Sequence, residues 1–493
     1  MAKCSIEHCN LDVYESDSKC ILHCQKHEYS VDFNKIGFLK AFYDELVNSI
    51  IRELSSDYSE QKLSLYFKDE LDEADSYSVD EYIKEEVIVF NNIYFPQSKE
   101  IDSFDYTKIL KRLGQIHFNY CEFSTSYLDL DSTKCFFQDC KFHNGLSLSN
   151  IPVLENELNV LFQKCEFGNT VSSSPWDKQL VIDSPLFSDC SFTKINFDNT
   201  IFNEAIFKNS KDFDGSIKEL EIYDSVLKKE FVLDYHSIDS LIIRDTQFQE
   251  PLHMYKCRNI NELNITNSSF EKSVDFYNSS LGAFYTSNTL FSEFVNFEYC
   301  EFGLGEGIEE YFKAKFDYTT FKSFINFRNT FFYSGLDLSL TNLKENPNFL
   351  NTTIDYKYTN KETFRIIKNS FDKVGNFSDA NKFFAKEMQK DLNETFFLDS
   401  PAKKLMLWFN LGISNFGQFY WLPLLYIIGF SFLLSFINYE ELKCCEILNP
   451  LAKTLPFGRF LDEGKEFVHL LVYIVYSVLI YHFIVSVKRM IKR

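Results

Sequence analysis

Phenylalanine recurs at every fifth residue through one stretch of this 493-residue chain, LFSDCSFTKINFDNTIFNEAIF, residues 186–207. An α-helix repeats every 3.6 residues and a β-strand every 2.0, so a step of five belongs to neither element. A smaller residue lies two positions before each of the last four phenylalanines. The two sets are Phe187, Phe192, Phe197, Phe202 and Phe207, and Cys190, Ile195, Thr200 and Ala205. The stretch therefore consists of five-residue units, each with one large and one small inward position.

Four such units would close a square turn of about twenty residues, with one large side chain on each side. Stacked turns would place each phenylalanine over the next at the strand spacing of about 4.8 Å, and only the stack would form a core. The pattern resembles the pentapeptide-repeat family, whose fold is a right-handed, four-sided parallel β-helix. The alternative is chance spacing in a chain with 54 phenylalanines, and five of them in strict register argue against it.

The repeat extends beyond this stretch. A Cys-x-Phe pattern places cysteine in the small inward position, which predicts core packing rather than metal binding, at Cys121, Cys135, Cys140, Cys165, Cys190 and Cys300. Residues 219–239, 240–261 and 262–282 align as a longer repeat. The matched columns are Leu227, Phe248, Phe270, Phe291 and Phe321, and Val232, Leu252, Val274, Val295 and Ile325. The sequence predicts a β-helix over residues 110–345, with about ten turns and a length of about 50 Å.

Residues 1–30 form a Cys/His module with two close cysteine pairs about ten residues apart. Thiolates and imidazoles in two such clips are the ligands of a tetrahedral structural zinc. A segment this short has too few apolar residues to form a stable core without a bound metal. Free surface thiols are the other interpretation. The expected zinc ligands are Cys4, Cys9, Cys20 and Cys24, with His23 and His27 as alternate ligands.

The net charge of −21 argues against a general nucleic-acid binder, which would need cations to neutralise phosphates. Nine carboxylates and one lysine lie between Asp69 and Glu86. This run is a solvated face or a docking patch for a basic partner. The opening MAKCSIEHCN lacks the apolar core of a secretory signal, so we expect the N-terminal region in a reducing cytoplasm, without disulfides.

We expect residues 31–109 to form a helical and acidic region that caps the β-helix. Residues 33–54 have an apolar stripe at helical spacing, and residues 87–96 alternate as a strand does and stop at Pro96. We expect both elements to cover the open first turn of the β-helix, because an uncovered strand edge would recruit other strands.

Two apolar segments, 421–437 and 467–487, contain no Asp, Glu, Lys or Arg. The second has 21 residues, about 31 Å as a helix. The first has 17, and with the apolar GQFY that precedes it we expect it to span a bilayer with little tilt. A buried hairpin of a soluble protein is the alternative. Basic residues flank the pair, which predicts two spans with both termini cytoplasmic and residues 438–466 outside. These residues are Lys403, Lys404, Lys488, Arg489, Lys492 and Arg493.

A helical hairpin is predicted within residues 346–400, broken at Gly375-Asn376. This segment, SNFGQ (414–418), the closing YHFIVSVKRMIKR and the N-terminal CILHC resemble the modules of bacterial membrane-bound pentapeptide-repeat proteins. The resemblance covers most of the chain and implies an inner-membrane protein with a two-helix transmembrane module at 401–493. Some members of that group end in a potassium-channel-like pore. The segment ELKCCEILNPLAKTLPFGRFLDEGKE has no TVGYG-like filter, which argues against selective conduction of that kind.

Four polar residues of the second span fall within about 100° of one another on a helical wheel: His469, Tyr473, Tyr476 and Ser477. Polar groups that face lipid are costly, so this seam predicts a contact between the two spans or between subunits of a homo-oligomer. The other interpretation is a non-selective pore made by several copies, as in an effector of phage defence.

The sequence contains no Gly-rich phosphate loop, no nucleophile elbow and no spacing that places a catalytic triad. We therefore expect a non-enzymatic scaffold, anchored in the inner membrane, whose cytoplasmic β-helix binds a protein partner. Besides the pore, one further alternative is a DNA mimic that inhibits gyrase, as soluble pentapeptide-repeat relatives do through an acidic rod. A membrane anchor argues against this alternative, because it would keep the mimic far from most chromosomal gyrase.

Overall fold

The computed structural model describes residues 2–7, 9–14, 17–25, 38–55, 58–97, 104–126, 128, 130, 133–149, 160–173, 179–211, 213–304, 312–437 and 466–491. The chain divides into two compact units. The first comprises residues 1–334 and 341–345, and the second comprises residues 335–340 and 346–493. The first unit is a parallel β-solenoid preceded by helices, and the second is mainly helical.

Three helices precede the solenoid: α2 (Phe38–Leu54), α3 (Glu60–Phe67) and α4 (Glu73–Glu85). The apolar stripe predicted for α2 is buried at every described position, namely Phe38, Phe42, Leu46, Ile50 and Leu54. Helix α4 carries much of the acidic run. Its N-cap is Asp72, whose carboxylate accepts a hydrogen bond from the Asp75 N–H at 2.8 Å and so satisfies one of the unpaired donors of the first turn. A short helix, α5 (Thr107–Leu110), follows.

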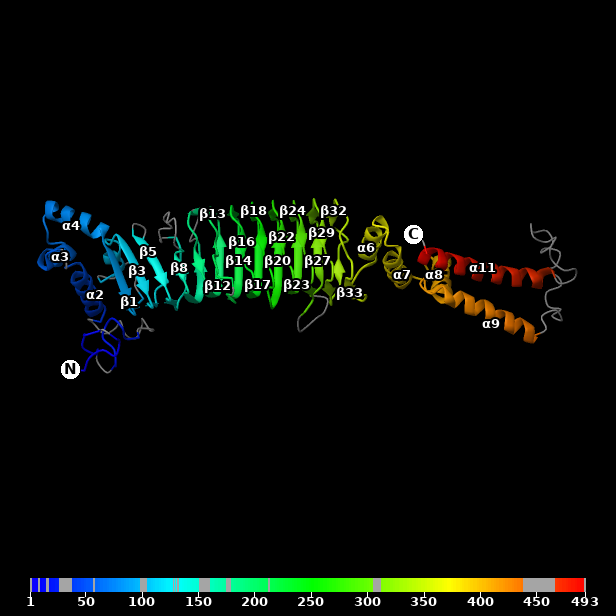
Figure 1. Ribbon diagram of the computed structural model, residues 1–493, viewed down its shortest axis with the longest axis horizontal. Helices are drawn as coiled ribbons and strands as arrows, with labels where there is room; N and C mark the ends of the chain where they lie inside the picture. The colour runs from blue at the N-terminus through cyan, green and yellow to red at the C-terminus, as the bar shows by residue number, and fades with distance from the viewer. Residues whose placement is uncertain are drawn as a thin grey trace. The chain divides into compact units, whose positions relative to one another are not determined.

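The strands of the solenoid form four parallel sheets (Figure 1). One sheet contains β1 (Val87–Asn91), β3 (Gln115–Asn119), β5 (Lys134–Gln138), β8 (Phe162–Gln163) and β11 (Phe187–Ser188). A second contains β10 (Leu180–Ile182), β13 (Thr200–Phe202), β15 (Val226–Leu227), β18 (Gln247–Phe248), β21 (Ser269–Phe270), β24 (Leu290–Phe291), β28 (Thr320–Phe321) and β32 (Asn342–Leu343).

The two remaining sheets differ in extent: one runs through most of the solenoid, and the other begins at Phe231, after the first sheet has ended at Ser188. The longer one follows the order β2 (Tyr94–Phe95), β4 (Glu122–Phe123), β6 (Lys141–Phe142), β9 (Glu166–Ser172), β12 (Ser191–Asp198), β14 (Ser216–Tyr223), β17 (Ser237–Arg244), β20 (Ile260–Thr266), β23 (Ser280–Ser287), β26 (Glu301–Phe302) and β30 (Phe331–Phe332), with β7 (Leu146–Ser147) and β27 (Ala314–Asp317) beside this path. The shorter one contains β16 (Phe231–Val232), β19 (Leu252–His253), β22 (Val274–Asp275), β25 (Val295–Asn296) and β29 (Ile325–Asn326). The stack comprises about ten turns of roughly 22 residues.

The phenylalanines of the five-residue repeat follow the chain through three of the sheets. Phe187 lies in β11, the next two phenylalanines lie in β12, and Phe202 lies in β13. Phe207 then forms a parallel bridge with Phe187, so one turn closes after twenty residues. All five side chains of this stretch are buried. A parallel turn of about twenty residues is thereby confirmed for this stretch, although Phe192 and Phe197 share one strand.

In the longer repeat the phenylalanines stack one over another. Ring centroids are 4.6 Å apart between Phe248 and Phe270, 4.9 Å between Phe270 and Phe291, and 4.8 Å between Phe291 and Phe321. These distances match the strand spacing of about 4.8 Å. The first predicted column is therefore confirmed at these positions.

The second predicted column is wrong at one position. Phe231, and not Val232, pairs with Leu252 and continues the column. Phe231 is buried, whereas Val232 is half-buried on the other side of the strand. A slip of one residue moves a side chain to the opposite face of a strand, and matching by residue type alone did not detect the slip.

The six Cys-x-Phe cysteines are buried in the solenoid, as predicted. Five of the thiols donate to backbone carbonyl groups of the preceding turn, for example Cys190 to Phe162 O at 3.4 Å and Cys300 to Phe276 O at 2.9 Å. The sixth, Cys135, donates to Thr133 O at 3.3 Å. Burial raises the pKa of Cys135 and Cys300 well above the ordinary value of a thiol. These cysteines are therefore packing residues.

The second unit begins with β31 (Leu336–Asp337) and β33 (Thr353–Ile354), followed by α6 (Lys361–Lys373) and α7 (Phe377–Glu394). The break between the two helices falls at Gly375-Asn376, where Gly375 has φ +77° and Asn376 caps α7. The predicted helical hairpin is thus present. Helices α8 (Pro401–Ser414), α9 (Trp421–Ile437) and α11 (Glu466–Ile491) complete the unit.

Among the described residues, one helix is long and apolar enough to cross a membrane, over Glu466–Arg489, and not two as predicted. Helix α9 has 17 residues, or about 25 Å, which is short of the roughly 30 Å hydrocarbon core. The prediction counted the preceding GQFY toward the span. Asn415, Phe416 and Gly417 instead have positive φ and separate α8 from α9. The predicted external segment, residues 438–465, lies outside the described residues.

Candidate functional site

The N-terminal module is folded by two short backbone pairings. Lys3 and Asp12 form an antiparallel bridge, and the Cys4 N–H donates to Leu11 O at 3.0 Å. Residues 20–24 form a turn in which the Cys24 N–H donates to Cys20 O at 2.9 Å. These pairings bring together two segments that are separate in the sequence.

Four potential metal ligands converge in this module. The ligand atoms of Cys4, Cys9, Cys20 and His23 all lie within 4.8 Å of one another. His23 Nδ1 is 3.4 Å from the Cys4 sulfur and 3.1 Å from the Cys20 sulfur, and the Cys9 and Cys20 sulfurs are 3.8 Å apart. A tetrahedral site with metal–sulfur bonds of about 2.3 Å has ligands about 3.8 Å apart. The four residues therefore form a possible metal site.

The ligand set differs from the predicted one at one position. Cys24 was expected as a ligand with His23 as its alternate, but His23 completes the cluster. The Cys24 thiol instead donates to Ile21 O at 3.7 Å. The other alternate, His27, lies outside the described residues. The sequence indicates both Cys24 and His23 as candidate ligands. The backbone turn at residues 20–24 determines that His23, and not Cys24, lies close to the other ligand atoms.

Burial and hydrogen bonding act differently on the thiols of the cluster. Burial raises the pKa of Cys20 to about 12. Burial acts in the same direction on Cys4, but backbone hydrogen bonds at Ile6 and Cys20 outweigh it and lower the pKa of this thiol. Metal binding requires thiolates, so a bound cation would favour the deprotonated form at Cys20.

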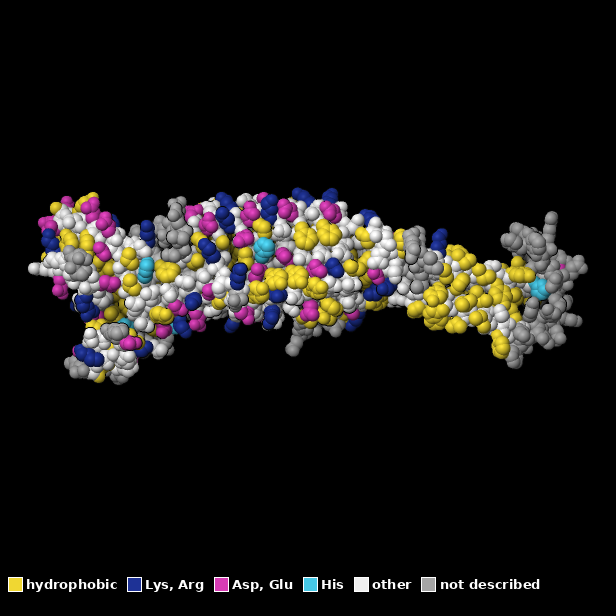
Figure 2. Space-filling model, viewed as in Figure 1, with side chains coloured by type: hydrophobic (Ala, Val, Ile, Leu, Met, Phe, Trp, Pro, Cys, Tyr) yellow, Lys and Arg dark blue, Asp and Glu magenta, His cyan; other side chains and the backbone are white. Residues whose placement is uncertain are grey.

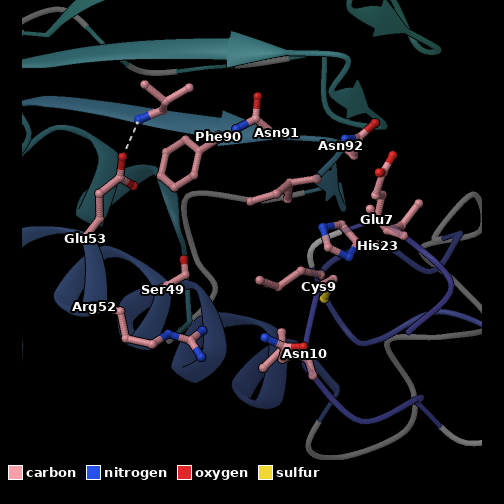
Figure 3. Close-up of a pocket in the computed structure, with 15 residues that line it drawn as sticks. Glu7, Cys9, Asn10, His23, Ser49, Arg52, Glu53, Phe90, Asn91 and Asn92 are labelled. Carbon is pink, nitrogen blue, oxygen red and sulfur yellow. Dashed lines mark hydrogen bonds between the residues drawn. The ribbon is translucent and has the colours of Figure 1, made fainter. Parts of the chain in front are cut away.

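A cavity of about 410 Å³ adjoins the cluster (Figure 3). Cys9 and His23 line one side of it, α2 contributes Ser49, Arg52 and Glu53, and residues 89–93 line another side. The Glu53 carboxylate accepts a hydrogen bond from the Val89 N–H at 3.2 Å, and burial raises the pKa of Glu53.

The module and α2 also cover the first strands of the solenoid. The Tyr94 N–H in β2 donates to Leu22 O at 2.8 Å, and Phe42 of α2 packs edge-on against Phe95 at 6.1 Å. Together with the Glu53 bond to β1, these contacts agree with the expectation that the N-terminal region covers the first turn. The cluster is thus part of the structure that closes this edge.

The polar residues predicted as one seam of α11 have different surroundings. The Tyr476 hydroxyl lies 2.5 Å from Ser431 Oγ of α9, and its ring meets Phe430 edge-on at 5.3 Å. Tyr473 is 56% exposed, and Ser477 is also exposed. His469 is half-buried. Within the described residues, Tyr476 therefore contributes to the α9–α11 contact, whereas Tyr473 and Ser477 face outward.

The exposed apolar surface of helix α8 was not predicted from the sequence. Its side chains Leu405, Met406, Trp408 and Phe409 are between 50% and 67% exposed. The signal was present in PAKKLMLWFNLGIS, where two lysines precede an apolar run, but the run is too short for a membrane span. Figure 2 shows hydrophobic side chains covering the surface of the C-terminal helices.

No protein-family model matches the chain, and no curated protein and no solved structure is significantly similar to it. The fold and the sites define the class. The chain is a parallel β-solenoid with an N-terminal Cys/His cluster and C-terminal helices that include one candidate membrane span.

Proposed function

We propose that this chain is a non-enzymatic scaffold of the pentapeptide-repeat kind, anchored in a bacterial inner membrane with its solenoid in the cytoplasm. The observation that carries the proposal is the exposed apolar surface of α11. Only 11% of its apolar window is buried, whereas a core helix of a soluble protein would be mostly buried. A contiguous apolar surface of this kind requires a lipid or protein environment.

The proposed anchor contains more than α11. Helix α9 pairs with α11 through the Tyr476–Ser431 contact, and a shared polar contact of this kind stabilises helix pairs in lipid. We propose that α9 enters the bilayer beside α11 and forms a hairpin with it, although its 17 residues are shorter than the hydrocarbon core. Lys403 and Lys404 precede α9, and Lys488 and Arg489 end α11, so the positive-inside rule favours cytoplasmic termini.

The apolar face of α8 fits the boundary between headgroups and acyl chains. Trp408 and Phe409 are 66% and 64% exposed, and Lys403 and Lys404 lie one turn before them. Amphipathic helices with aromatic residues on one face and lysines near the other lie in the plane of the membrane surface. We therefore assign α8 to the cytoplasmic surface of the bilayer.

In the first unit, a ladder of tyrosines is the proposed partner surface. Tyr235 and Tyr255 have ring centroids 5.7 Å apart, Tyr255 and Tyr277 5.2 Å, and Tyr277 and Tyr299 5.6 Å. Lys256 Nζ lies 4.9 Å from the Tyr255 ring centroid. Stacked tyrosines with charged neighbours are typical of the residues that dominate protein interfaces, and the net charge of −21 argues against nucleic acid as the partner.

The metal in the N-terminal module is proposed to be a structural zinc. Three thiolates and one imidazole are a common ligand set of structural zinc sites, and four protein ligands leave no open position for catalysis. The module also contacts β2 through Leu22. We therefore assign zinc the role of holding the cover of the first turn in place.

Site-specific photo-crosslinking in membranes tests the scaffold function. A photoreactive phenylalanine derivative at Tyr299, which is 46% exposed, is compared with the same derivative at Tyr318, which is 64% exposed and lies at a different corner of the solenoid. We expect a discrete protein adduct at Tyr299 that decreases when Tyr235 and Tyr255 are changed to serine. Equal labelling at both positions, or none at either, would contradict a partner surface on the ladder.

A homo-oligomer, with or without a pore, is the second candidate. The exposure of Tyr473 and Ser477 on α11 favours it, because polar groups toward lipid are costly. Expression of the intact chain should then depolarise cells, and Tyr473→Leu with Ser477→Leu should abolish the effect. An unchanged membrane potential, with the protein shown to be inserted, would leave the anchor without a pore.

A further inference from the structure

A second cavity, of about 220 Å³, lies within the second unit, where α6, α7 and the end of α11 meet. Two cations line it, Lys368 of α6 and Arg489 of α11, together with one carboxylate, Asp372. Phe384 and Ala380 of α7 form its apolar side. The charged groups in the cavity wall therefore sum to one positive charge.

Arg489 is held in place without an anionic partner among the described residues. Its Nη1 donates to Phe416 O at 2.8 Å, and its guanidinium carbon lies 4.4 Å from the ring centroid of Phe384. Gly417, with φ +86°, allows this approach, because a Cβ atom there would lie 3.1 Å from the guanidinium. A half-buried cation normally has an anion beside it, and here the cavity occupies that position.

Lys368 also lies near Phe384, with Nζ 5.6 Å from the ring centroid. Its distance to Asp372 Oδ2 is 3.8 Å, which is longer than a hydrogen bond. Lys368 and Asp372 thus form an ion pair without a hydrogen bond, and the ammonium, which lines the cavity, can donate to a ligand there.

Asn381, which also lines the cavity, takes part in a pair of hydrogen bonds. The buried Asn381 amide donates to Gly417 O at 3.2 Å, and the Gln418 side chain donates to Asn381 O at 2.6 Å. These bonds tie α7 to the turn between α8 and α9. The cavity is thus lined by three helices, of which α7 is fixed to this turn.

We propose that this cavity binds a phosphate group, with Arg489 and Lys368 as its charged ligands. A planar guanidinium and an ammonium beside an apolar wall are the donors that phosphate recognition uses. The inference rests on the proposed membrane anchor, because Arg489 ends the apolar window of α11. A residue at that depth lies among lipid headgroups, so the expected source is an anionic phospholipid. Free phosphate is the other source of the same chemistry.

Thermal unfolding of the full chain in neutral detergent tests the proposal. The probes are phosphatidylglycerol, phosphatidylcholine and inorganic phosphate, added separately. Tryptophan fluorescence reports mainly on the second unit, because two of the three tryptophans, Trp408 and Trp421, lie there. A ligand that binds the folded state raises the unfolding temperature. We expect phosphatidylglycerol to raise it, phosphatidylcholine to have little effect, and inorganic phosphate to act only if the site takes a soluble anion.

Two pairs of variants locate the effect. Arg489→Gln removes a cavity cation, and Lys488→Gln removes the same charge from the neighbouring exposed residue. Lys368→Gln leaves every contact of Arg489 in place and is compared with Lys382→Gln, whose side chain is 62% exposed. Loss of a charge-assisted hydrogen bond should weaken lipid binding by about 10- to 100-fold in Arg489→Gln and Lys368→Gln. The two control variants should bind as the unmodified chain does.

The outcomes separate the cavity from the anchor. A shift that depends on Arg489 and Lys368 supports the site, and the probe that produces it identifies the source. No shift with any probe, or a shift that Lys488→Gln abolishes equally, overturns the site. Alkaline extraction of the same membranes is measured in parallel. A chain that stays in the membrane without a lipid effect refutes the cavity alone, whereas a chain that is extracted refutes the anchor.

Discussion

The solenoid and the C-terminal helices are both rich in large apolar residues, but they place them in opposite environments. Phe270 of the solenoid is 1% exposed, between stacked rings of the turns before and after it. Trp408 of α8 is 66% exposed and Phe432 of α9 is 67% exposed. Repetition allows the solenoid to bury each ring under the next turn. The C-terminal helices have no such repetition, so their apolar side chains need a partner outside the described residues, which we propose to be lipid.

The N-terminal module sharpens this comparison, because it has neither stacked rings nor a lipid-facing surface to stabilise it. We predict one zinc per chain, and its removal by a chelator should unfold residues 2–25. Structural zinc contributes about 10–16 kcal/mol in zinc-finger peptides, which makes this the largest effect expected. Metal analysis and protease sensitivity of the N-terminus measure it.

Matched cysteine variants give the control for the zinc prediction. Cys20→Ser should lose the metal, since the Cys20 sulfur lies 3.1 Å from His23 Nδ1, whereas Cys24→Ser should retain it. Equal loss in both variants would mean that Cys24 is a ligand and would contradict the observed ligand set.

Within the solenoid, Phe270→Ala should be the most damaging single change. It would leave a cavity between Phe248 and Phe291, and replacement of a buried phenylalanine by alanine typically costs about 3–5 kcal/mol. Urea-dependent proteolysis of the full chain measures the loss. Tyr318→Ala, at a side chain that is 64% exposed, should change stability by less than about 0.5 kcal/mol. Similar losses in both variants would show that the stacked column does not form the core.

The contact between α9 and α11 should contribute the least. Tyr476→Phe removes the hydroxyl that meets Ser431 Oγ, and polar contacts between membrane helices average about 0.6 kcal/mol. Thermal unfolding in detergent should show a small decrease. Tyr473→Phe is the matched change at an exposed position and should have no effect. A larger effect at Tyr473 would indicate that the outward face of α11, and not its α9 face, is in contact with another helix.

The repeat could be predicted from the sequence because its information is local and redundant. Each phenylalanine from Phe187 to Phe207 independently indicates the same repeat. A wrong assignment at one position, such as Val232 in place of Phe231 in the longer repeat, therefore does not change the predicted fold. The stacked columns could be predicted for the same reason.

The sites depend on single backbone features, which periodicity does not encode. His23 joins the cluster in place of Cys24 because of one turn at residues 20–24. The left-handed residues from Asn415 to Gly417 end α8, and GQFY (417–420) does not lengthen α9 beyond its 17 residues. The cavity at Arg489 joins residues more than one hundred positions apart in the sequence, which no spacing rule could have found.

The central claim is that the exposed apolar surface of α11 faces lipid, and one pair of substitutions tests it directly. Val478, in the middle of the apolar window, and Val181 of β10 are 42% and 44% exposed. The test compares Val478→Lys and Val181→Lys by alkaline extraction of membranes that contain the full chain. A lysine at the centre of a span costs about 2.5–3.5 kcal/mol, whereas a lysine on a wet surface costs little. We predict that the unmodified chain and Val181→Lys remain in the membrane and that Val478→Lys is released. Equal behaviour of the two variants, or release of the unmodified chain, would contradict the account.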